Sequence, residues 1–376
     1  MRKVFLILVT TLFAFSCEKD EPDNLKPGFS GGDGTLNSPY LIGSAEDLDN
    51  IRHYVNQDFF SRNAYFKQIS DIDLSVFSEG KGWEPIEVFS GNYDGNGYII
   101  STLTINRPDE GNLGLFGKLE VQRDPIFEGN IKNIILEDVH IVGGYETGAI
   151  AGRNSGTLIN CLVTGKIVAK GRDEYMGAFG GLVGINNGSI HESSAIIEIQ
   201  LVDGYNFVAG GLAGISNVSS ILRSFAGGEI MVSNNDSNHQ IAGGMVGMSI
   251  SWPGTDVISD CYAYTIISGG NGQILGGLMG QSNGNLFMIN SYAVGSVSDT
   301  GSKTGGLIGD VVGGLNVKDS FWDINTTGQE SSSGSGSEYG KTTEEMKMQQ
   351  TFYSWDFNNI WKIEEGISYP LLRWQE

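Results

Sequence analysis

Short apolar runs framed by glycine recur through the middle of the chain. Each run holds two or three apolar residues, and a glycine closes it. The closing glycines follow one another at intervals of 35, 32, 30, 33, 33 and 29 residues. The seven runs are Gly114–Gly117, Gly148–Gly152, Gly180–Gly184, Gly210–Gly214, Gly243–Gly247, Gly276–Gly280 and Gly305–Gly309. Variable spacing around a fixed core is typical of a solenoid whose repeats carry loops of different length.

A second pattern, with the period of a β-strand, follows each of the last six runs. It is centred on a small residue, here called the anchor: Cys161, Ser193, Ser224, Cys261, Ser291 and Ser320. Three positions earlier stand Leu158, Ile190, Ile221, Ile258, Met288 and Val317, and two positions later Val163, Ala195, Ala226, Ala263, Ala293 and Trp322. The anchor and the residue two positions later share one face of a strand. Because five of these six pairs are small, they predict a narrow interior in which like residues stack.

These patterns favour an all-β fold, a single-stranded parallel β-helix that we expect to be right-handed. Helical repeats are excluded, because each glycine would cost about 1 kcal/mol in a helix interior. A propeller has repeats of similar length, but each blade needs four longer strands. We expect the motif glycines to allow tight corners with positive φ. Asparagine suits the same corners, as in Asn154-Ser155-Gly156 and Asn186-Asn187-Gly188.

Both ends of the solenoid carry the pattern of a short helical cap, which would protect open strand edges. Ser44 is a predicted N-cap, and Leu48, Ile51 and Val55 form one apolar stripe after it. Thr342-Thr343-Glu344-Glu345 is a predicted capping box that opens a helix through about Gln350. The aromatic residues that follow are expected to seal the mouth of the helix; they are Trp355, Phe357, Trp361 and Tyr369.

The amino terminus has the pattern of an export signal. Residues 1–16 combine a basic start with about a dozen apolar residues, too few to span a bilayer. Ala14-Phe15-Ser16-Cys17 resembles the lipobox of bacterial lipoproteins, which implies lipid attachment at Cys17; the alternative is an ordinary cleaved signal with an incidental cysteine. The acids after Cys17 resemble the export signal of Bacteroidota lipoproteins, which implies the outer membrane and the cell surface. Residues 17–34 then form a predicted flexible tether.

The repeat and its flanks resemble the GLUG motif of bacterial surface proteins. The motif is the repeated Gly-Gly-Leu-x-Gly followed by Asn-x-Gly and Ile-x-x-(Cys/Ser). Matching flanks include Asp33-Gly34-Thr35, Trp83-Glu84-Pro85-Ile86, Ser320-Phe321-Trp322-Asp323 and Tyr369-Pro370-Leu371-Leu372-Arg373-Trp374. The likeness covers roughly residues 31–374. It implies a β-helical surface protein of an adhesin type, and it does not imply a catalytic mechanism. We expect an N-terminal cap and first coils at 35–110, GLUG repeats at 111–325 and a C-terminal cap at 326–376.

The composition and the net charge of the chain limit which partners and which covalent links we expect. The 376 residues carry a formal net charge of −21, which makes nucleic acid a poor partner. With Cys17 committed to lipid, only Cys161 and Cys261 remain; they stand three repeats apart, roughly 14 Å if coils stack at about 4.8 Å, which is too far to bridge. We expect two buried free thiols in a monomer, with no cofactor and no metal site.

The sequence offers little for catalysis. Hydrolases of the β-helix fold use clustered aspartates with His-Gly and Arg-x-Lys nearby, and the chain has no Asp-Asp pair, no His-Gly and no Arg-x-Lys. We therefore expect no enzyme and no catalytic residue, but a binding or adhesion protein whose ligand is a glycan or an extracellular protein. Two alternatives stay open: a β-helical polysaccharide-degrading enzyme, and a structural shaft module of a surface assembly.

The candidate ligand-binding residues are aromatic. One position past the anchor, and opposite in parity to the interior pair, stand Phe225, Tyr262, Tyr292 and Phe321. Such an outward column could stack on sugar rings or anchor a protein partner, or it could stabilise the sheet or lie under a loop. Trp252 is the second candidate, because the segment from Gly247 to Cys261 is longer than its counterparts and Trp252-Pro253-Gly254 would form its tip.

Overall fold

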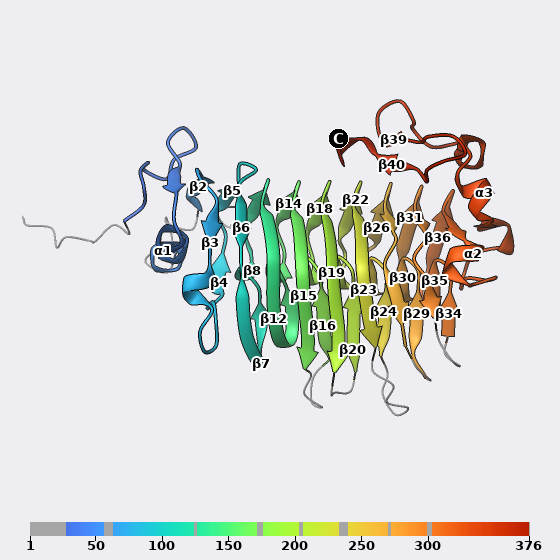
Figure 1. The fold of residues 1–376 in the computed structure, drawn as a ribbon, viewed down its shortest axis with the longest axis horizontal. Helices are drawn as coiled ribbons and strands as arrows, with labels where there is room; N and C mark the ends of the chain where they lie inside the picture. The colour runs from blue at the N-terminus through green and yellow to red at the C-terminus, as the bar shows by residue number, and fades with distance from the viewer. Residues whose placement is uncertain are drawn as a thin grey trace, which may run out of the picture.

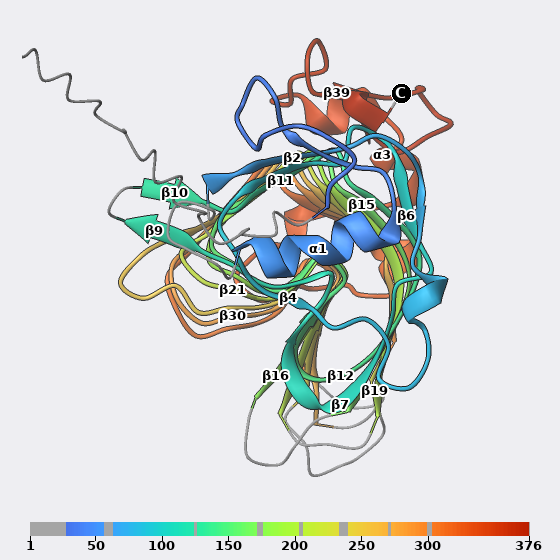
Figure 2. The same ribbon diagram turned by 90° about the vertical axis from the view of Figure 1, so that its left-hand side faces the viewer.

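The computed structural model is an elongated parallel β-helix (Figure 1). It describes residues 28–55, 63–123, 126–170, 176–202, 206–232, 240–269, 272–298 and 303–375, and the side chains of 121–128 are not considered. The predicted signal peptide and Cys17 lie outside these residues. Viewed from the N-terminal end, the chain turns clockwise as it recedes, so the helix is right-handed (Figure 2). The expected fold class is confirmed.

The first side of the solenoid is a ten-stranded parallel sheet of very short strands, here called the upper sheet. Every strand pairs in register with its equivalent in the next coil. Its strands are β1 (Tyr40–Ile42), β2 (Tyr65–Gln68), β5 (Asn92–Asp94), β11 (Asn130–Lys132), β14 (Thr157–Ile159), β18 (Ser189–His191), β22 (Ser220–Leu222), β26 (Asp256–Ser259), β31 (Leu286–Ile289) and β36 (Leu315–Lys318).

The second side is an eight-stranded parallel sheet formed largely by the glycine-framed runs. Each run supplies the end of one strand and the start of the next. The strands are β4 (Ile86–Phe89), β8 (Phe116–Leu119), β13 (Ala151–Asn154), β17 (Val183–Asn186), β21 (Ala213–Ser216), β25 (Val246–Ser249), β30 (Met279–Ser282) and β35 (Ile308–Val311).

The third side continues beyond the body of the helix as a ridge, which the sequence patterns did not predict. Long strands run down this side, and return strands come back up the ridge (Figure 2). The descending strands are β3 (Ile72–Asp73), β6 (Ile99–Ser101), β7 (Thr104–Leu113), β12 (Ile135–Gly148), β15 (Leu162–Lys170), β19 (Ser194–Val202), β23 (Phe225–Val232), β27 (Tyr262–Ala263), β28 (Ile266–Ser268), β32 (Tyr292–Ala293), β33 (Val297–Ser298) and β37 (Phe321–Asp323). The returning strands are β16 (Gly177–Gly180), β20 (Phe207–Gly210), β24 (Ile241–Gly243), β29 (Ile274–Gly276) and β34 (Lys303–Gly305). The ends of β7 and β12 also belong to the returning side, because β12 pairs there with β16 and with the end of β7.

The predicted ladders of like residues are confirmed. Ala195, Ala226, Ala263 and Ala293 are Cα partners in successive coils, and all are fully buried. The anchors align as well: the amide of Cys161 donates to Ser193 Oγ at 3.0 Å, and one coil further the amide of Ser193 donates to Ser224 Oγ at 3.1 Å. Cys161 and Cys261 are free and buried, as expected, and burial raises the pKa of the Cys161 thiol to about 12.

The role expected for the motif glycines is wrong. Neither Gly181 nor Gly211 has a positive φ, but a Cβ at Gly181 would stand 2.2 Å from the carbonyl oxygen of Gly211 in the next coil. Glycine is required there because the backbones of neighbouring coils approach too closely for any side chain. Asn154 and Asn186 do not form left-handed corners either; they are buried and joined by an amide hydrogen bond of 2.8 Å.

Left-handed backbone is found at another corner, directly before each anchor and before Ile134, which holds the anchor position one coil earlier. The residues there have φ between 47° and 56°, and they are Asn133, Asn160, Glu192, Arg223, Asp260, Asn290 and Asp319. Asparagine and aspartate tolerate this conformation best among residues with a side chain. The turn from the upper sheet to the third side is therefore the same in the seven coils from β11 to β36.

The N-terminal cap agrees with its prediction. Helix α1 (Ala45–Val55) lies across the open end of the solenoid, and Ser44 Oγ caps it by accepting the amide of Asp47 at 3.1 Å (Figure 2). The apolar stripe of Leu48, Ile51 and Val55 is buried against the first coils. The described part of the predicted tether is not free, because residues 30 and 31 form hydrogen bonds with Leu41 of β1.

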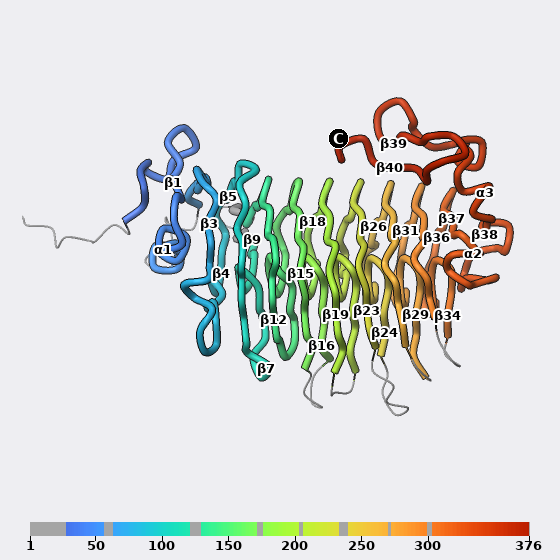
Figure 3. Tube along the Cα trace, viewed as in Figure 1, coloured from blue at the N-terminus to red at the C-terminus, as the bar shows by residue number. Residues whose placement is uncertain are grey.

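The C-terminal segment does not lie where we expected it. The capping box at Thr342 is present, but helix α3 (Thr343–Met346) is a single turn, and a 3₁₀ turn (Gln349–Phe352) follows it. Trp322 ends the interior ladder, and Asp323 caps the short helix α2 (Ile324–Thr327) at the mouth. The later aromatics do not seal the mouth. Residues 343–375, which include the small β39 (Trp361–Lys362) and β40 (Leu371–Leu372) pair, run back along the outside of the coils (Figures 1 and 3).

Candidate functional site

The predicted aromatic column exists and points outward. Phe225, Tyr262, Tyr292 and Phe321 are Cα partners in four successive coils. The first three rings stack face to face, with centroids 5.0 Å apart for Phe225 and Tyr262 and 5.1 Å apart for Tyr262 and Tyr292. The strand parity that separates this column from the interior alanines is therefore as expected.

The column is not open to a ligand, which corrects its assignment as a binding surface. All four side chains are between 1% and 6% exposed, because the C-terminal segment lies over them. The covering side chains are Met346, Phe352, Trp355, Trp361 and Leu372. Polar contacts fix the segment: Tyr292 Oη donates to the carbonyl of Pro370 at 2.5 Å, and Trp374 Nε1 donates to the carbonyl of Arg223 at 2.7 Å. Burial raises the pKa of Tyr262 and of Tyr292.

Trp252 is exposed, as predicted. Its side chain is 80% exposed at the tip of the loop between β25 and β26, next to a cis peptide bond to Pro253. The carbonyl of Gly254 accepts a hydrogen bond of 3.0 Å from Asn285 Nδ2 in the next coil, which ties the loop to the stack. Trp252 is therefore available as a contact residue.

Beneath this loop lies a buried carboxyl group that the sequence patterns did not single out. Asp256 is fully buried, and it accepts hydrogen bonds from the amide of Ser219 at 2.8 Å and from Ser251 Oγ at 2.6 Å. Ser249 Oγ also donates to it. Because it has no access to solvent and is saturated with donors, this carboxyl group stabilises the coil and is not placed for acid–base chemistry.

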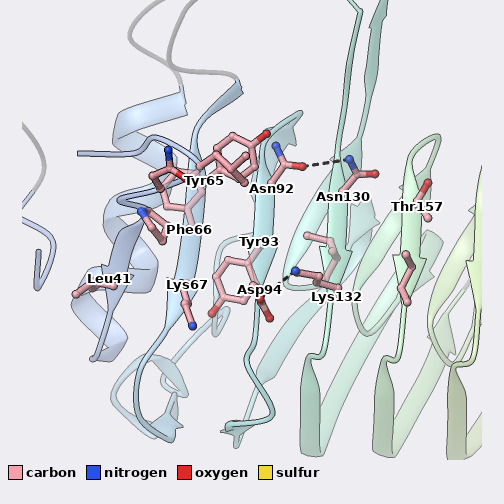
Figure 4. A pocket seen from close by; sticks show the side chains of 15 residues that line it. Leu41, Tyr65, Phe66, Lys67, Asn92, Tyr93, Asp94, Asn130, Lys132 and Thr157 are labelled. Carbon is pink, nitrogen blue, oxygen red and sulfur yellow. Dashed lines mark hydrogen bonds and ion pairs between the residues drawn. The ribbon is translucent and has the colours of Figure 1, made fainter. Parts of the chain in front are cut away.

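A hollow lies on the first coils of the upper sheet, and we call it the N-terminal groove. It has a volume of about 770 Å³ (Figure 4). The side chains that project into it belong to the outward rows of β1, β2, β5, β11 and β14, and the loop before β1 forms one wall. They include Leu36, Leu41, Tyr65, Lys67, Asn92, Asp94, Asn130, Lys132, Thr157 and Ile159.

Two rows of side chains cross the groove along the helix axis. In one row, Tyr65, Asn92, Asn130 and Thr157 are successive Cα partners. In the other, Leu41, Lys67, Asp94, Lys132 and Ile159 are partners in the same way. Since equivalent residues of adjacent coils are about 4.8 Å apart, the groove presents a regular series of polar groups.

Polar contacts order the middle of the groove. Asn130 Nδ2 donates to Asn92 Oδ1 at 3.1 Å, and Lys132 Nζ lies 3.2 Å from Asp94 Oδ2 (Figure 4). Burial opposes the ionisation of Asp94, but hydrogen bonds from Asn133 and from the amide of Asn96, together with Lys132, lower the pKa of its carboxyl group. Asp94 is therefore charged and engaged at neutral pH.

The lining of the groove does not hold the carboxylate pair of a glycoside hydrolase. Asp94 is the one carboxylate among its described lining residues, whereas glycoside hydrolysis needs two. Among the described residues of the whole chain, no group of three or more His, Cys, Asp or Glu side chains could hold a metal ion. The arrangement is suited to holding a ligand by hydrogen bonds, by apolar contacts and by the Lys67 ammonium group, which has no ion-pair partner among the described residues. The sequence patterns missed it because most of its residues come before the anchor pattern, which starts at Leu158, and because they lie in five separate segments.

The fold and this open face define the chain as a parallel β-helix with a hollow on its upper sheet. Comparisons with known proteins support this fold but do not establish a function. No protein-family model matches the chain. A structure from Bacteroides ovatus named "putative immunoglobulin A1 protease" aligns with a TM-score of 0.61 at 20% identity, over 93% of this chain and 96% of that one. At this identity the similarity is one of fold.

Two relatives match about half of the chain each. The protein named "Halomucin" from Haloquadratum walsbyi is 38% identical over 192 residues, which is 49% of this chain. The "Putative Gly-rich membrane protein" from Evansella cellulosilytica is 32% identical over 173 residues, or 42% of this chain. The matched parts make up only 2% and 18% of these relatives. Within the described part of the chain, no helix is both long and apolar enough to cross a membrane.

Proposed function

We propose that this chain is a non-catalytic binding protein of the GLUG type, displayed on the cell surface and attached to the outer membrane through a lipid on Cys17. Its ligand is an extracellular glycan or protein. The observation that carries the binding function is the N-terminal groove, an open hollow of about 770 Å³ on a face whose strands are locked in register from coil to coil.

The surface location has separate support. The names of the two relatives, a mucin-like name and a membrane protein, agree with display outside the cell. The N-terminal sequence supplies a means of export and attachment. Covalent lipid on one cysteine would hold the chain at a membrane without any spanning helix.

Binding is favoured over catalysis by the state of the groove's carboxylate. Asp94 accepts hydrogen bonds and is paired with Lys132, so its pKa is lowered. A general acid at neutral pH needs a raised pKa, and a retaining or inverting glycosidase needs a second carboxylate about 5 to 10 Å away. The described lining offers neither.

A binding array tests the function. The chain without its first 17 residues is applied to immobilised glycans and extracellular matrix proteins, with Trp252→Ala measured beside it to separate contacts at the loop from contacts in the groove. We expect saturable binding to at least one class of ligand and no turnover of the glycans in solution. Release of shortened oligosaccharides would instead establish the enzyme, and absence of any binding would favour a structural shaft.

The lipid anchor is tested independently. In bacteria that process lipoproteins, Cys17→Ala should move the protein from the membrane fraction to the soluble fraction, because the acyl chains are attached at that sulfur. Cys161→Ala serves as the control, since that thiol is buried in the solenoid. Equal membrane retention of the Cys17→Ala variant and the parent would refute the anchor.

A further inference from the structure

We propose that the N-terminal groove takes an oligosaccharide that carries carboxylate groups, laid along the helix axis, with Lys67 as the counter-ion of one carboxylate. This inference rests on the proposed binding function and names the class of its ligand. Lys67, Tyr65 and the Asn92–Asn130 pair are the residues that recognise it.

The shape of the groove favours a chain molecule over a compact one. Its polar row passes through four coils, from Tyr65 through Asn92 and Asn130 to Thr157. The spacing of about 4.8 Å between coils is close to the length of one sugar unit in an extended polysaccharide. Successive sugars can therefore meet successive side chains of the same row.

Unused hydrogen-bonding groups are available along this row. The Asn130 Nδ2 to Asn92 Oδ1 bond leaves the amide nitrogen of Asn92 and the amide oxygen of Asn130 directed away from the pair (Figure 4). One is a donor and the other an acceptor, and the Thr157 hydroxyl can act as either. Sugar hydroxyls also both donate and accept, so this set is complementary to a glycan.

Apolar surface at the N-terminal end completes a sugar-binding surface. Tyr65 is partly exposed in β2, Leu41 of β1 is the Cα partner of Lys67, and Leu36 of the wall is 69% exposed. The C–H face of a pyranose ring packs on aromatic and aliphatic side chains, whereas its hydroxyls stay at the rim. A ring seated on Tyr65 would lie next to Lys67, two residues along the same strand and on the same face.

Charge selects the acidic form of the sugar. Lys67 lies between Leu41 and Asp94 in register, yet Asp94 pairs with Lys132, and Lys67 has no ion-pair partner among the described residues. Lys67 is a partly buried residue on a chain of net charge −21, so its positive charge favours an acidic ligand locally. One carboxylate per few sugars would neutralise it, whereas a densely sulfated chain would be repelled by the rest of the surface.

Calorimetry with matched ligands and matched variants tests the proposal. The probes are oligogalacturonate and oligomannuronate, each compared with its methyl ester, which removes the charge and keeps the sugar. We expect the acid form of one series to bind, the ester to bind at least about tenfold more weakly, and Lys67→Met to lose a similar factor. Affinity should also fall as salt is raised.

Lys318→Met is the control, because Lys318 is an exposed lysine in the last strand of the same sheet, outside the groove. It should bind as the parent does, and both variants should melt at the parent's temperature. Equal affinity for acid and ester, equal binding by Lys67→Met and Lys318→Met, or no binding of either acid series would overturn the proposal. Any of these results would leave binding of other ligands on the array, and hence the proposed function, intact.

Discussion

Asp256→Ala should lower the free energy of unfolding by about 3 kcal/mol, because it removes the shared acceptor of a buried set of donors. In the parent, the amide of Ser219 donates to this carboxyl group at 2.8 Å and the hydroxyl of Ser251 at 2.6 Å, and the Ser249 hydroxyl donates as well. Alanine would leave a small cavity lined by polar groups without partners. Chemical denaturation followed by circular dichroism measures the loss.

Asp256→Asn is the informative comparison. Its amide oxygen can still accept from the amide of Ser219, and its nitrogen can donate to a serine hydroxyl, which is able to accept. We expect it to lose less than half as much stability as Asp256→Ala. Equal stability of the alanine variant and the parent would mean that the buried contacts described around Asp256 contribute nothing net.

A chain that ends at Lys341 should melt about 10 °C or more below the full chain and should associate in solution. Truncation uncovers Phe225, Tyr262, Tyr292 and Phe321, which are almost fully buried beneath the C-terminal segment. Each aromatic side chain carries about 150–250 Å² of surface. The four side chains together would therefore form a contiguous apolar patch of a few hundred Å², which is large enough to promote association.

Melting curves, light scattering after gel filtration and binding of a hydrophobic dye measure this effect. Tyr353→Ala is the control, since that side chain is 82% exposed in the same segment. A truncated chain that stays monomeric and melts with the parent would contradict the assigned role of the segment.

The loss of stability at alkaline pH offers a second measurement of the contact between the C-terminal segment and the coils. Burial, with a hydrogen bond to Asp323 and its charge, raises the pKa of Tyr369 to about 12 from an ordinary value of 10.0. A raised folded-state pKa means that the unfolded chain loses the proton first. The stability contribution is therefore complete below pH 10.0 and declines as the pH rises toward 12. The full chain should lose stability across this range more steeply than the truncated chain does.

The ladders could be predicted from the sequence because they are built into its repeat. A residue at a fixed distance from each motif must face the same way in every coil, so the alignment of Ala195 with Ala226 and Ala263 required no structure. The outward direction of Tyr262 followed from the same period of two. The C-terminal segment that covers this outward column is distant in the sequence, so the repeat pattern could not predict the contact.

The groove and the cause of the glycine pattern were beyond the same reasoning. Asn92 and Asn130 are 38 positions apart and precede the first anchor, Cys161, so their pairing has no sequence signature. The glycines were recognised correctly but explained by backbone conformation, whereas the structure explains them by the close approach of coils. A sequence identifies that Gly181 matters, but only the neighbouring coil shows why.

The hydrogen bond from Trp374 to Arg223 joins positions 151 apart and has a mechanical consequence. In a solenoid without a covering segment, the terminal coil can unfold while the other coils stay folded. Here the C-terminal segment must first detach from the four coils that it covers. A force applied at the C-terminus therefore meets one large initial barrier in place of a series of small ones. The half of the stack nearest that end should consequently yield as a single block.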